Sequence, residues 1–209
     1  MTETDWEKVY EILNKLHTDY IDVFLGRENI DVIVSKSFAK ASKEKALENH
    51  FVQAISSVIE DVEGFRIIQQ PSYPVNAEKK IGDFALSFNG EIIAFYEFKE
   101  LYTLHNVNQS PTKRLQGIVK DVRSLIKVKE AFPMCPCFII ILDVGDRYLY
   151  KNLESEIYHI RPRVALKGEW HKPSIRVAFG IFEIDVNPPE PVPDERSPLD
   201  KLLNPKRNQ

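Results

Sequence analysis

The stretch IGDFALSFNGEIIAFYEFKE, residues 81–100, decides how this chain folds. The Asn89-Gly90 pair near its centre is the dipeptide most favoured in a two-residue β-hairpin, because Asn and Gly tolerate the positive φ angles of such a turn. The run that follows the pair alternates between two sets of side chains, which is typical of a strand. We therefore expect two antiparallel strands, with Asp83 opening the first and Glu97 lying toward the end of the second.

The second strand of this hairpin carries charged side chains on one face. With a period of two, one face presents Ile93, Phe95, Glu97 and Lys99, and the other presents Ala94, Tyr96, Phe98 and Glu100. The hairpin returns Asp83 to a position beside Glu97 and Lys99. Two crowded carboxylates repel each other unless a positive charge lies between them, and a hard divalent cation such as Mg²⁺ is the usual solution. Such a cluster can hold a metal at a scissile phosphate and activate a water.

The spacing of these charges resembles that of the PD-(D/E)xK nuclease superfamily, whose restriction-endonuclease-like core carries an aspartate and then a strand with Glu/Asp-x-Lys. The matching residues are Asp83, Glu97 and Lys99, and Gly82 stands where the family name has proline. The resemblance implies an α/β fold in which a mixed central β-sheet is flanked by helices. It also implies that Asp83 and Glu97 bind Mg²⁺, for which Mn²⁺ can substitute. The Phe98 carbonyl would be a further ligand, and Lys99 would assist the attacking water.

A helix over residues 42–62 precedes the hairpin and offers one more carboxylate. Its apolar stripe consists of Leu47, Phe51, Ala54, Ile55, Val58, Ile59 and Val62. Glu48 borders this stripe, and members of the superfamily often place a glutamate on the corresponding helix. The resemblance therefore adds Glu48 to the catalytic residues, while an ordinary surface helix residue is an equal alternative.

A simpler interpretation of the charged strand also exists. Glu-x-Lys on a strand is commonly a solvated face that forms a cross-strand ion pair, here with Asp83. The neighbouring Phe95 and Phe98 argue against it, because they indicate a buried strand in which unpaired charges are costly and usually functional.

The remaining segments predict the rest of an α/β domain. We expect helices at about 6–24, 111–131 and 148–160, and strands at about 65–69, 138–143 and 176–184. The strand–helix–strand order around the 111–131 helix favours a parallel strand pair. The expected organisation is an N-terminal helical extension packed on the core (1–43), a nuclease-like core (44–186) and a Pro-rich C-terminal tail (187–209).

Two basic regions are candidates for nucleic-acid contacts, although the chain has a net charge of −3. The first is a face of the 111–131 helix with Lys113, Gln116 and Lys120. The second is the stretch 161–176, which holds five basic residues and one acidic residue and includes Arg161, Arg163 and Lys167. We expect this stretch to be a loop, where basic groups bind phosphates. A solvated helix face and a plain surface loop are the alternatives.

Composition narrows the setting in which such a protein works. The N-terminus MTETDWEK lacks the features of a secretory signal, and no apolar run approaches the length of a membrane helix. Cys135 and Cys137 are too close for an ordinary disulfide, so we expect them to pack in a core in a reducing compartment. We thus expect a soluble, cytoplasmic protein with no membrane partner and no nucleotide cofactor.

The favoured hypothesis is a Mg²⁺-dependent endonuclease that hydrolyses phosphodiester bonds in DNA, most simply a restriction-type enzyme acting as a homodimer. A nuclease of DNA repair, recombination or transposition with the same fold is the first alternative. The second is a nucleic-acid-binding or assembly module that has lost catalysis. The third is a protein that is not a nuclease, in which the three charges form a structural ion-pair network.

Overall fold

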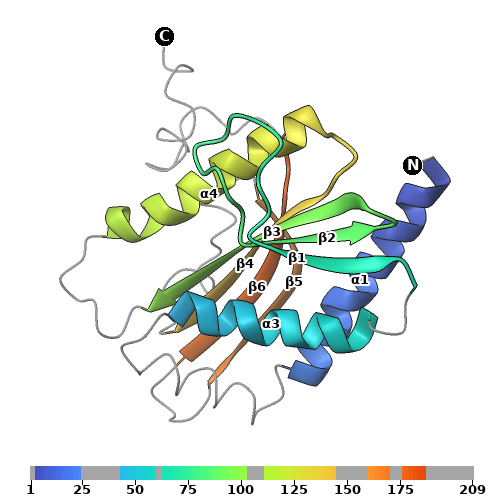
Figure 1. Cartoon of the computed structure of the whole chain (residues 1–209). Coiled ribbons are helices and arrows are strands. Elements are labelled where there is room, and N and C mark those ends of the chain that lie inside the picture. The colour runs from blue at the N-terminus through green and yellow to red at the C-terminus, as the bar shows by residue number, and fades with distance from the viewer. Residues whose placement is uncertain are drawn as a thin grey trace.

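A computed structural model of the chain describes residues 3–24, 43–59, 63–102, 111–144, 160–169 and 176–186 (Figure 1). Its helices are α1 (Glu3–Phe24), α3 (Lys43–Ile59) and α4 (Pro111–Ala131), and its strands are β1 (Phe65–Gln69), β2 (Phe84–Phe88), β3 (Glu91–Tyr102), β4 (Cys137–Val144), β5 (Ile160–Glu169) and β6 (Arg176–Ile184). These elements confirm the predicted α/β class.

The described strands form one mixed six-stranded sheet in the order β1-β2-β3-β4-β6-β5. Strands β3 and β4 run parallel, and the other neighbouring pairs are antiparallel. Helix α4 makes the crossover between β3 and β4, because two parallel neighbours cannot be joined by a tight turn. The parallel pair predicted from the strand–helix–strand order is therefore confirmed.

The β2–β3 hairpin turns at Asn89 and Gly90, whose φ angles are 50° and 86°. Both residues lie in the left-handed region, which is what a two-residue hairpin turn with matching twist demands. The antiparallel register then pairs Phe84 with Tyr96 and so brings Asp83 level with Glu97. The predicted hairpin is confirmed.

One detail of this hairpin differs from simple alternation. Leu86 pairs with Ala94 but the next residue, Ser87, pairs with Ile92, so Ile93 is an extra residue on β3. Such a bulge places consecutive side chains on the same side of the sheet. Ile93 consequently packs in the same core layer as Ala94, and its predicted place beside Phe95 is wrong.

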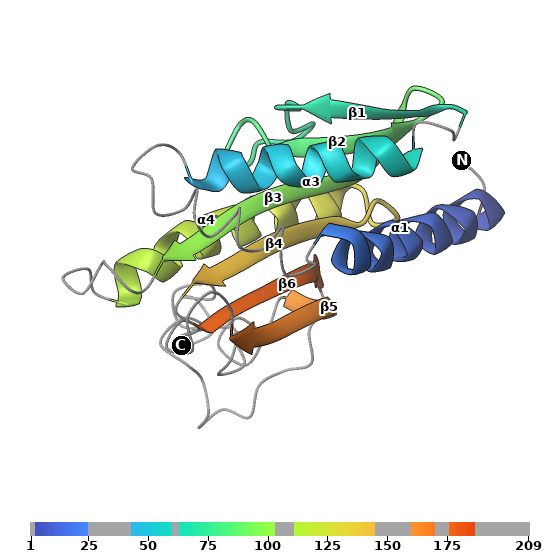
Figure 2. The ribbon, with the colours of Figure 1, turned by 90° about the horizontal axis from the view of Figure 1, so that it is seen from below.

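Helices cover both faces of the sheet, with α1 and α3 on one face and α4 on the other (Figure 2). The α1/α3 layer packs Leu13 and Phe51 against Tyr96 and Phe98 of β3. The α4 layer includes Ile118, Val122, Leu125, Phe95, Ile139 and Ile141. Alternate residues of β3 therefore enter opposite layers, and Glu97 belongs to the side that faces α4.

A buried polar contact joins α1 to the centre of the sheet. The Tyr96 hydroxyl lies 2.9 Å from His17 Nε2, and both residues are at most 1% exposed. We expect Tyr96→Phe to lower the free energy of unfolding by about 1–3 kcal/mol, because it removes this bond from a buried ring nitrogen. Urea denaturation of Tyr96→Phe, His17→Phe and the double variant should give a coupling energy of roughly 1 kcal/mol. Strictly additive losses would contradict this account.

The basic stretch 161–176 is not the loop that its composition predicted. Residues 160–169 form strand β5, which pairs with β6 from Ile160↔Ile184 to Glu169↔Arg176. The physical reason lies in β6, whose second edge would otherwise leave its backbone groups unpaired. Residues 170–175 and the predicted helix before Ile160 lie outside the described residues, as does the 187–209 tail.

Cys135 and Cys137 are both buried free thiols, as expected from their spacing. Burial raises the pKa of Cys135 to about 12, so this thiol stays protonated at neutral pH.

In the described part of the chain, no helix has the length and apolarity needed to cross a membrane.

Candidate active site

Asp83 is fixed at the point where β2 begins. Its Oδ2 atom accepts a hydrogen bond from the backbone N–H of Phe98 over 2.9 Å. Its own carbonyl accepts from the N–H of Gln70 at the end of β1, over 3.0 Å. The Asp83 side chain thus bridges the two strands of the hairpin, and its predicted approach to Glu97 is confirmed.

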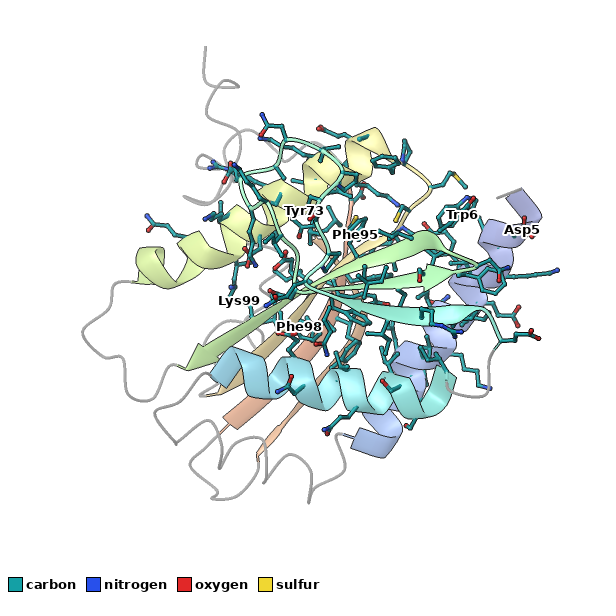
Figure 3. The ribbon with its side chains drawn as sticks, in the orientation of Figure 1. Asp5, Trp6, Tyr73, Phe95, Phe98 and Lys99 are labelled. Atoms are coloured by element: carbon teal, nitrogen blue, oxygen red, sulfur yellow. The ribbon has the colours of Figure 1, made fainter. Side chains whose placement is uncertain are left out.

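Phe98 contributes to this arrangement only through its backbone. Its ring packs in the α1/α3 layer, 5.2 Å from the ring of Phe51, on the face of the sheet opposite Glu97 (Figure 3). The metal-ligand role expected of the Phe98 carbonyl stays a prediction.

Glu97 is the most deeply buried charged residue of the candidate site, with a fully buried side chain. The Tyr73 hydroxyl donates a hydrogen bond to Glu97 Oε1, and Lys79 Nζ donates to Oε2 over 2.5 Å. Tyr73 lies on the α4 side of the sheet (Figure 3). Both oxygens of the Glu97 carboxylate are therefore held by neighbouring side chains.

Lys79 places its ammonium group between three carboxylates. Its Nζ atom is 2.5 Å from Glu97 Oε2, 3.4 Å from Asp83 Oδ1 and 3.7 Å from Asp121 Oδ1. These acids come from β3, from the start of β2 and from α4, so their convergence is created by the tertiary fold. We call Asp83, Glu97 and Asp121 the carboxylate cluster.

The backbone of the segment that carries Lys79 is anchored at several points. The Lys79 N–H donates to Ser124 Oγ of α4 over 2.9 Å. The N–H of Tyr73 donates to the carbonyl of Lys80 over 3.1 Å, and the N–H of Gly82 donates to the carbonyl of Pro71 over 2.8 Å. These bonds fold the segment between β1 and β2 back on itself and set Lys79 over the cluster.

Lys99 is held on the same side of the sheet by Asp121. The Lys99 ammonium lies 2.9 Å from Asp121 Oδ2. Gly117 lies one turn before Asp121 on α4, and a Cβ atom at Gly117 would be 3.8 Å from Lys99 Cε, so the lysine stem runs along this part of the helix. The Lys99 side chain is 16% exposed and the Asp121 side chain 4%. The ammonium is thus oriented by a buried acid.

The charges of this group do not balance when every member is ionised. Three carboxylates face the two ammonium groups of Lys79 and Lys99, which leaves one negative charge in excess. Burial, reinforced by the negative charges of Asp83 and Asp121, raises the pKa of Glu97 to about 9, although Lys79 opposes the shift. At neutral pH a proton on Glu97 therefore supplies the missing positive charge.

Lys79 and Tyr73, the titratable groups that contact Glu97, also have pKa values shifted by burial and by neighbouring charges. Burial alone would lower the pKa of Lys79, but the carboxylates of Glu97 and Asp121 outweigh it and raise that pKa above its ordinary value. Burial and then the charge of Glu97 raise the pKa of Tyr73. Lys79 thus stays charged, and Tyr73 stays a hydrogen-bond donor, throughout the neutral range.

Sequence reasoning missed three members of this group: Tyr73, Lys79 and Asp121. Asp121 had a visible signal, because it lies on the apolar stripe of α4, three residues after Ile118 and four before Leu125. An acid on a buried helix face requires a partner. The Lys79-Lys80 pair gave no such signal, since two adjacent lysines in a loop are normally solvated.

The predicted accessory residues lie around this centre in different ways. Glu48 is 5% exposed on α3, which covers the face of the sheet opposite Glu97, so its catalytic role stays a prediction. Its alternative as an ordinary exposed residue of the helix surface is wrong. Gln116 and Lys120 are exposed on α4. Lys113 lies in the first turn of α4, and its side chain is outside the described ones.

Strand β5 carries the remaining basic candidates, Arg161, Arg163 and Lys167, whose side chains are also outside the described ones. The register aligns Phe98 with Ile140 and Ile181, and these with Val164 of β5. Since β5 is three strands away from β3 in the sheet, its backbone lies about 14 Å from the candidate site.

The chemistry of the cluster fits a hard divalent cation. Carboxylate oxygens are the ligands that Mg²⁺ and Mn²⁺ prefer, and the cluster already surrounds one cationic group, the Lys79 ammonium. Within the described ranges, no three His, Cys, Asp or Glu side chains stand in a geometry ready to hold a metal ion.

No protein-family model matches this sequence, and neither curated proteins nor solved structures yield a match.

Proposed function

We propose that this protein is a Mg²⁺-dependent endonuclease of the restriction-endonuclease-like class that hydrolyses phosphodiester bonds in DNA. The observation that carries the proposal is the convergence of Asp83 and Glu97 at the end of the β2–β3 hairpin, with Lys99 two residues further along β3 and paired with Asp121. The order of α3, the three strands, α4 and β4 also suits that class of core. Cleavage of both strands of a symmetric site would suit a homodimer.

Asp83 and Glu97 are the residues that would hold the metal, whereas Glu48 lies on the helix that covers the opposite face of the sheet and is outside the carboxylate cluster. A bound Mg²⁺ or Mn²⁺ would supply Lewis-acid polarisation of the phosphate and a lowered pKa of water. Lys99 places a positive charge beside Asp121 of the carboxylate cluster, from where it would orient the attacking water and stabilise the developing negative charge. Asp121 keeps the Lys99 ammonium directed toward this region.

Two surfaces support DNA as the substrate. Gln116 and Lys120 are exposed on α4, the helix that also carries Asp121. Strand β5 carries three basic residues, Arg161, Arg163 and Lys167, about 14 Å from β3, a distance that a bound DNA duplex easily spans. Basic groups at these places would bind phosphates and set the position of the duplex.

The Lys79 ion pairs favour a second candidate, a protein that is not a nuclease, in which these charges form a structural ion-pair network. In that case Lys79 would neutralise the carboxylates permanently, and the cluster would need no metal. The two functions make opposite predictions for cleavage.

A nuclease of repair, recombination or transposition shares the proposed chemistry and differs in the DNA structure that it cuts.

Cleavage of supercoiled, linear and branched DNA with Mg²⁺, with Mn²⁺ and with EDTA tests the proposal. We expect cleavage only with metal, and a loss of at least about a hundredfold in Asp83→Asn and in Lys99→Met. Lys8→Met, which removes an exposed lysine of α1, is the control and should cut like the wild type.

The pattern of products distinguishes the alternatives. Discrete fragments from linear DNA favour a restriction-type enzyme, whereas nicking or cutting at branches favours repair or recombination. Equal cleavage by the wild type and both site variants would show a contaminating nuclease and overturn the assignment. DNA binding without cleavage under any metal condition would instead support a nucleic-acid-binding module that has lost catalysis.

A further inference from the structure

The position of Lys79 raises a question about how a metal could enter the site. Its ammonium lies within 4 Å of a carboxylate oxygen from each of Asp83, Glu97 and Asp121. One cationic group of the chain thus already occupies the place where those acids converge. A metal ion would compete with this ammonium for the same carboxylates, because both are cations.

We propose that Lys79 is a built-in counter-ion that holds the carboxylate cluster in the metal-free protein and leaves it when a divalent cation binds. The inference rests on the proposed function, because it concerns the same metal site. Its consequence is that Lys79 lowers the affinity for the metal and sets the concentration of free Mg²⁺ at which the site becomes loaded.

Distance and charge explain why the ammonium must leave. Lys79 Nζ is 2.5 Å from Glu97 Oε2, and a Mg²⁺ ion needs that oxygen at about 2.1 Å with its own shell of ligands around it. Two cations that share one carboxylate would also repel each other, and the repulsion is weakly screened here because Glu97 and Asp121 are almost completely buried. The metal and the ammonium therefore compete for the cluster.

The structure also explains how the exchange can occur without unfolding. The backbone around Lys79 is anchored by Ser124 and by the Tyr73–Lys80 hydrogen bond, but the lysine side chain is 28% exposed. A flexible four-carbon stem can swing toward solvent while the segment keeps its place. The movement thus requires a change of side-chain rotamer and no rearrangement of the sheet.

Metal titrations of Lys79 variants test this inference. Isothermal titration calorimetry with MgCl₂ and MnCl₂, together with electron paramagnetic resonance of free Mn²⁺, measures the affinity without any substrate. We expect Lys79→Met to bind Mn²⁺ roughly tenfold more tightly than the wild type or better, because it removes a competing positive charge. In EDTA, the same variant should melt at a lower temperature, since the carboxylates lose their counter-ion.

Matched controls isolate the role of the charge. Lys79→Arg keeps a cation over the cluster and should not gain affinity. Lys80→Met removes the neighbouring exposed lysine and should behave like the wild type. Lys79→Gln keeps a hydrogen-bond donor for Glu97. If circular dichroism shows that Lys79→Met does not fold, Lys79→Gln replaces it as the neutral variant.

Each outcome separates this inference from the proposed function. Equal or weaker Mn²⁺ binding by both neutral variants, in a wild type that binds the metal, overturns the inference and leaves the nuclease proposal standing. Binding by Lys79→Met or Lys79→Gln, but not by the wild type, supports the inference and contradicts a metal-dependent activity of the native chain. Absence of binding in every protein overturns both.

Discussion

Replacing Glu97 with glutamine is expected to yield a protein that has lost DNA cleavage but is harder to unfold than the wild type at neutral and alkaline pH. The loss of activity should be about a thousandfold or more, because the substitution removes a charged ligand from the proposed metal site. The gain in stability has a separate cause. It follows from the state of Glu97 in the metal-free protein.

The sign of the stability effect comes from the raised pKa of Glu97, which burial and the charges of Asp83 and Asp121 bring to about 9. An unfolded chain releases this proton near the ordinary pKa of a glutamate, about 4.3. Between these two values the folded state holds one more proton than the unfolded state. The Glu97 contribution to the free energy of unfolding therefore falls by about 1.4 kcal/mol per pH unit as the pH rises through this window.

A glutamine at position 97 mimics the protonated acid at every pH. Its amide oxygen can accept from Lys79, and its NH₂ group can donate toward Asp83 and to the Tyr73 hydroxyl, which would turn from donor to acceptor. The amide carries no charge that must be buried. We therefore expect similar stability of the two proteins near pH 5 and an advantage of a few kcal/mol for Glu97→Gln near pH 8.

Urea denaturation in EDTA at several pH values measures this difference, and Glu91→Gln at the exposed start of β3 is the control. Titrating groups that do not contact position 97 affect both proteins equally, so the difference between the two reports on Glu97 and its immediate partners. A Glu97→Gln variant that is less stable than the wild type at pH 8 would show that Glu97 is ionised in the folded protein. It would thereby contradict the account of the site.

The hairpin that carries the site was predictable because its determinants are local. The Asn89-Gly90 turn and the alternation of the flanking runs fix the pairing of neighbouring segments, and Asp83 and Glu97 follow from that pairing. The bulge at Ile93 was not predictable from alternation alone. The bulge depends on how β3 packs between two helical layers, and an alternating sequence pattern contains no information about that packing.

The rest of the site depends on contacts between segments far apart in the chain. Lys79 reaches the cluster because its segment folds back and is held by Ser124, 45 residues later. No local pattern around Lys79 reports that contact. Asp121 is an intermediate case, since its place on an apolar helix stripe marks it as buried without naming its partners.

The loop predicted at residues 161–176 was wrong for the same reason, because strand β5 forms through pairing with a distant segment. A basic composition favours a solvated loop, but the pairing of a strand is decided by the backbone of its neighbour, here β6. Side-chain composition constrains which face is exposed, whereas hydrogen-bond satisfaction decides whether a strand forms. The sequence of residues 161–176 alone does not show that β6 has an edge to pair with, so it could not predict that the segment forms a strand.

The affinity for divalent cations should depend steeply on pH, and this second large effect connects Glu97 with Lys79. A metal ligand must be deprotonated, so a cation that binds Glu97 displaces the proton that this acid holds below about pH 9. Each ion bound then releases one proton. The apparent affinity should rise about tenfold per pH unit, and thus about a hundredfold from pH 6 to pH 8.

Lys79 does not add to this slope. Its own pKa is raised by the carboxylates of Glu97 and Asp121, which outweigh the lowering effect of burial, so it stays charged over the whole interval. Its competition with the metal therefore sets the level of the affinity, while Glu97 sets the dependence on pH. Removing Lys79 should shift the curve toward tighter binding, by less than the lost charge alone would give because the pKa of Glu97 then rises further, and should leave the slope unchanged.

Calorimetric titration with MnCl₂ at pH 6, 7 and 8, in buffers of different ionisation enthalpy, counts the protons released directly. We expect a value near one for the wild type and for Lys79→Met, and a value near zero for any residual binding by Glu97→Gln. An affinity that does not change between pH 6 and pH 8 would mean that the metal is bound without Glu97. The carboxylate cluster would then be a structural ion-pair network, and the metal site would have to be sought elsewhere in the chain.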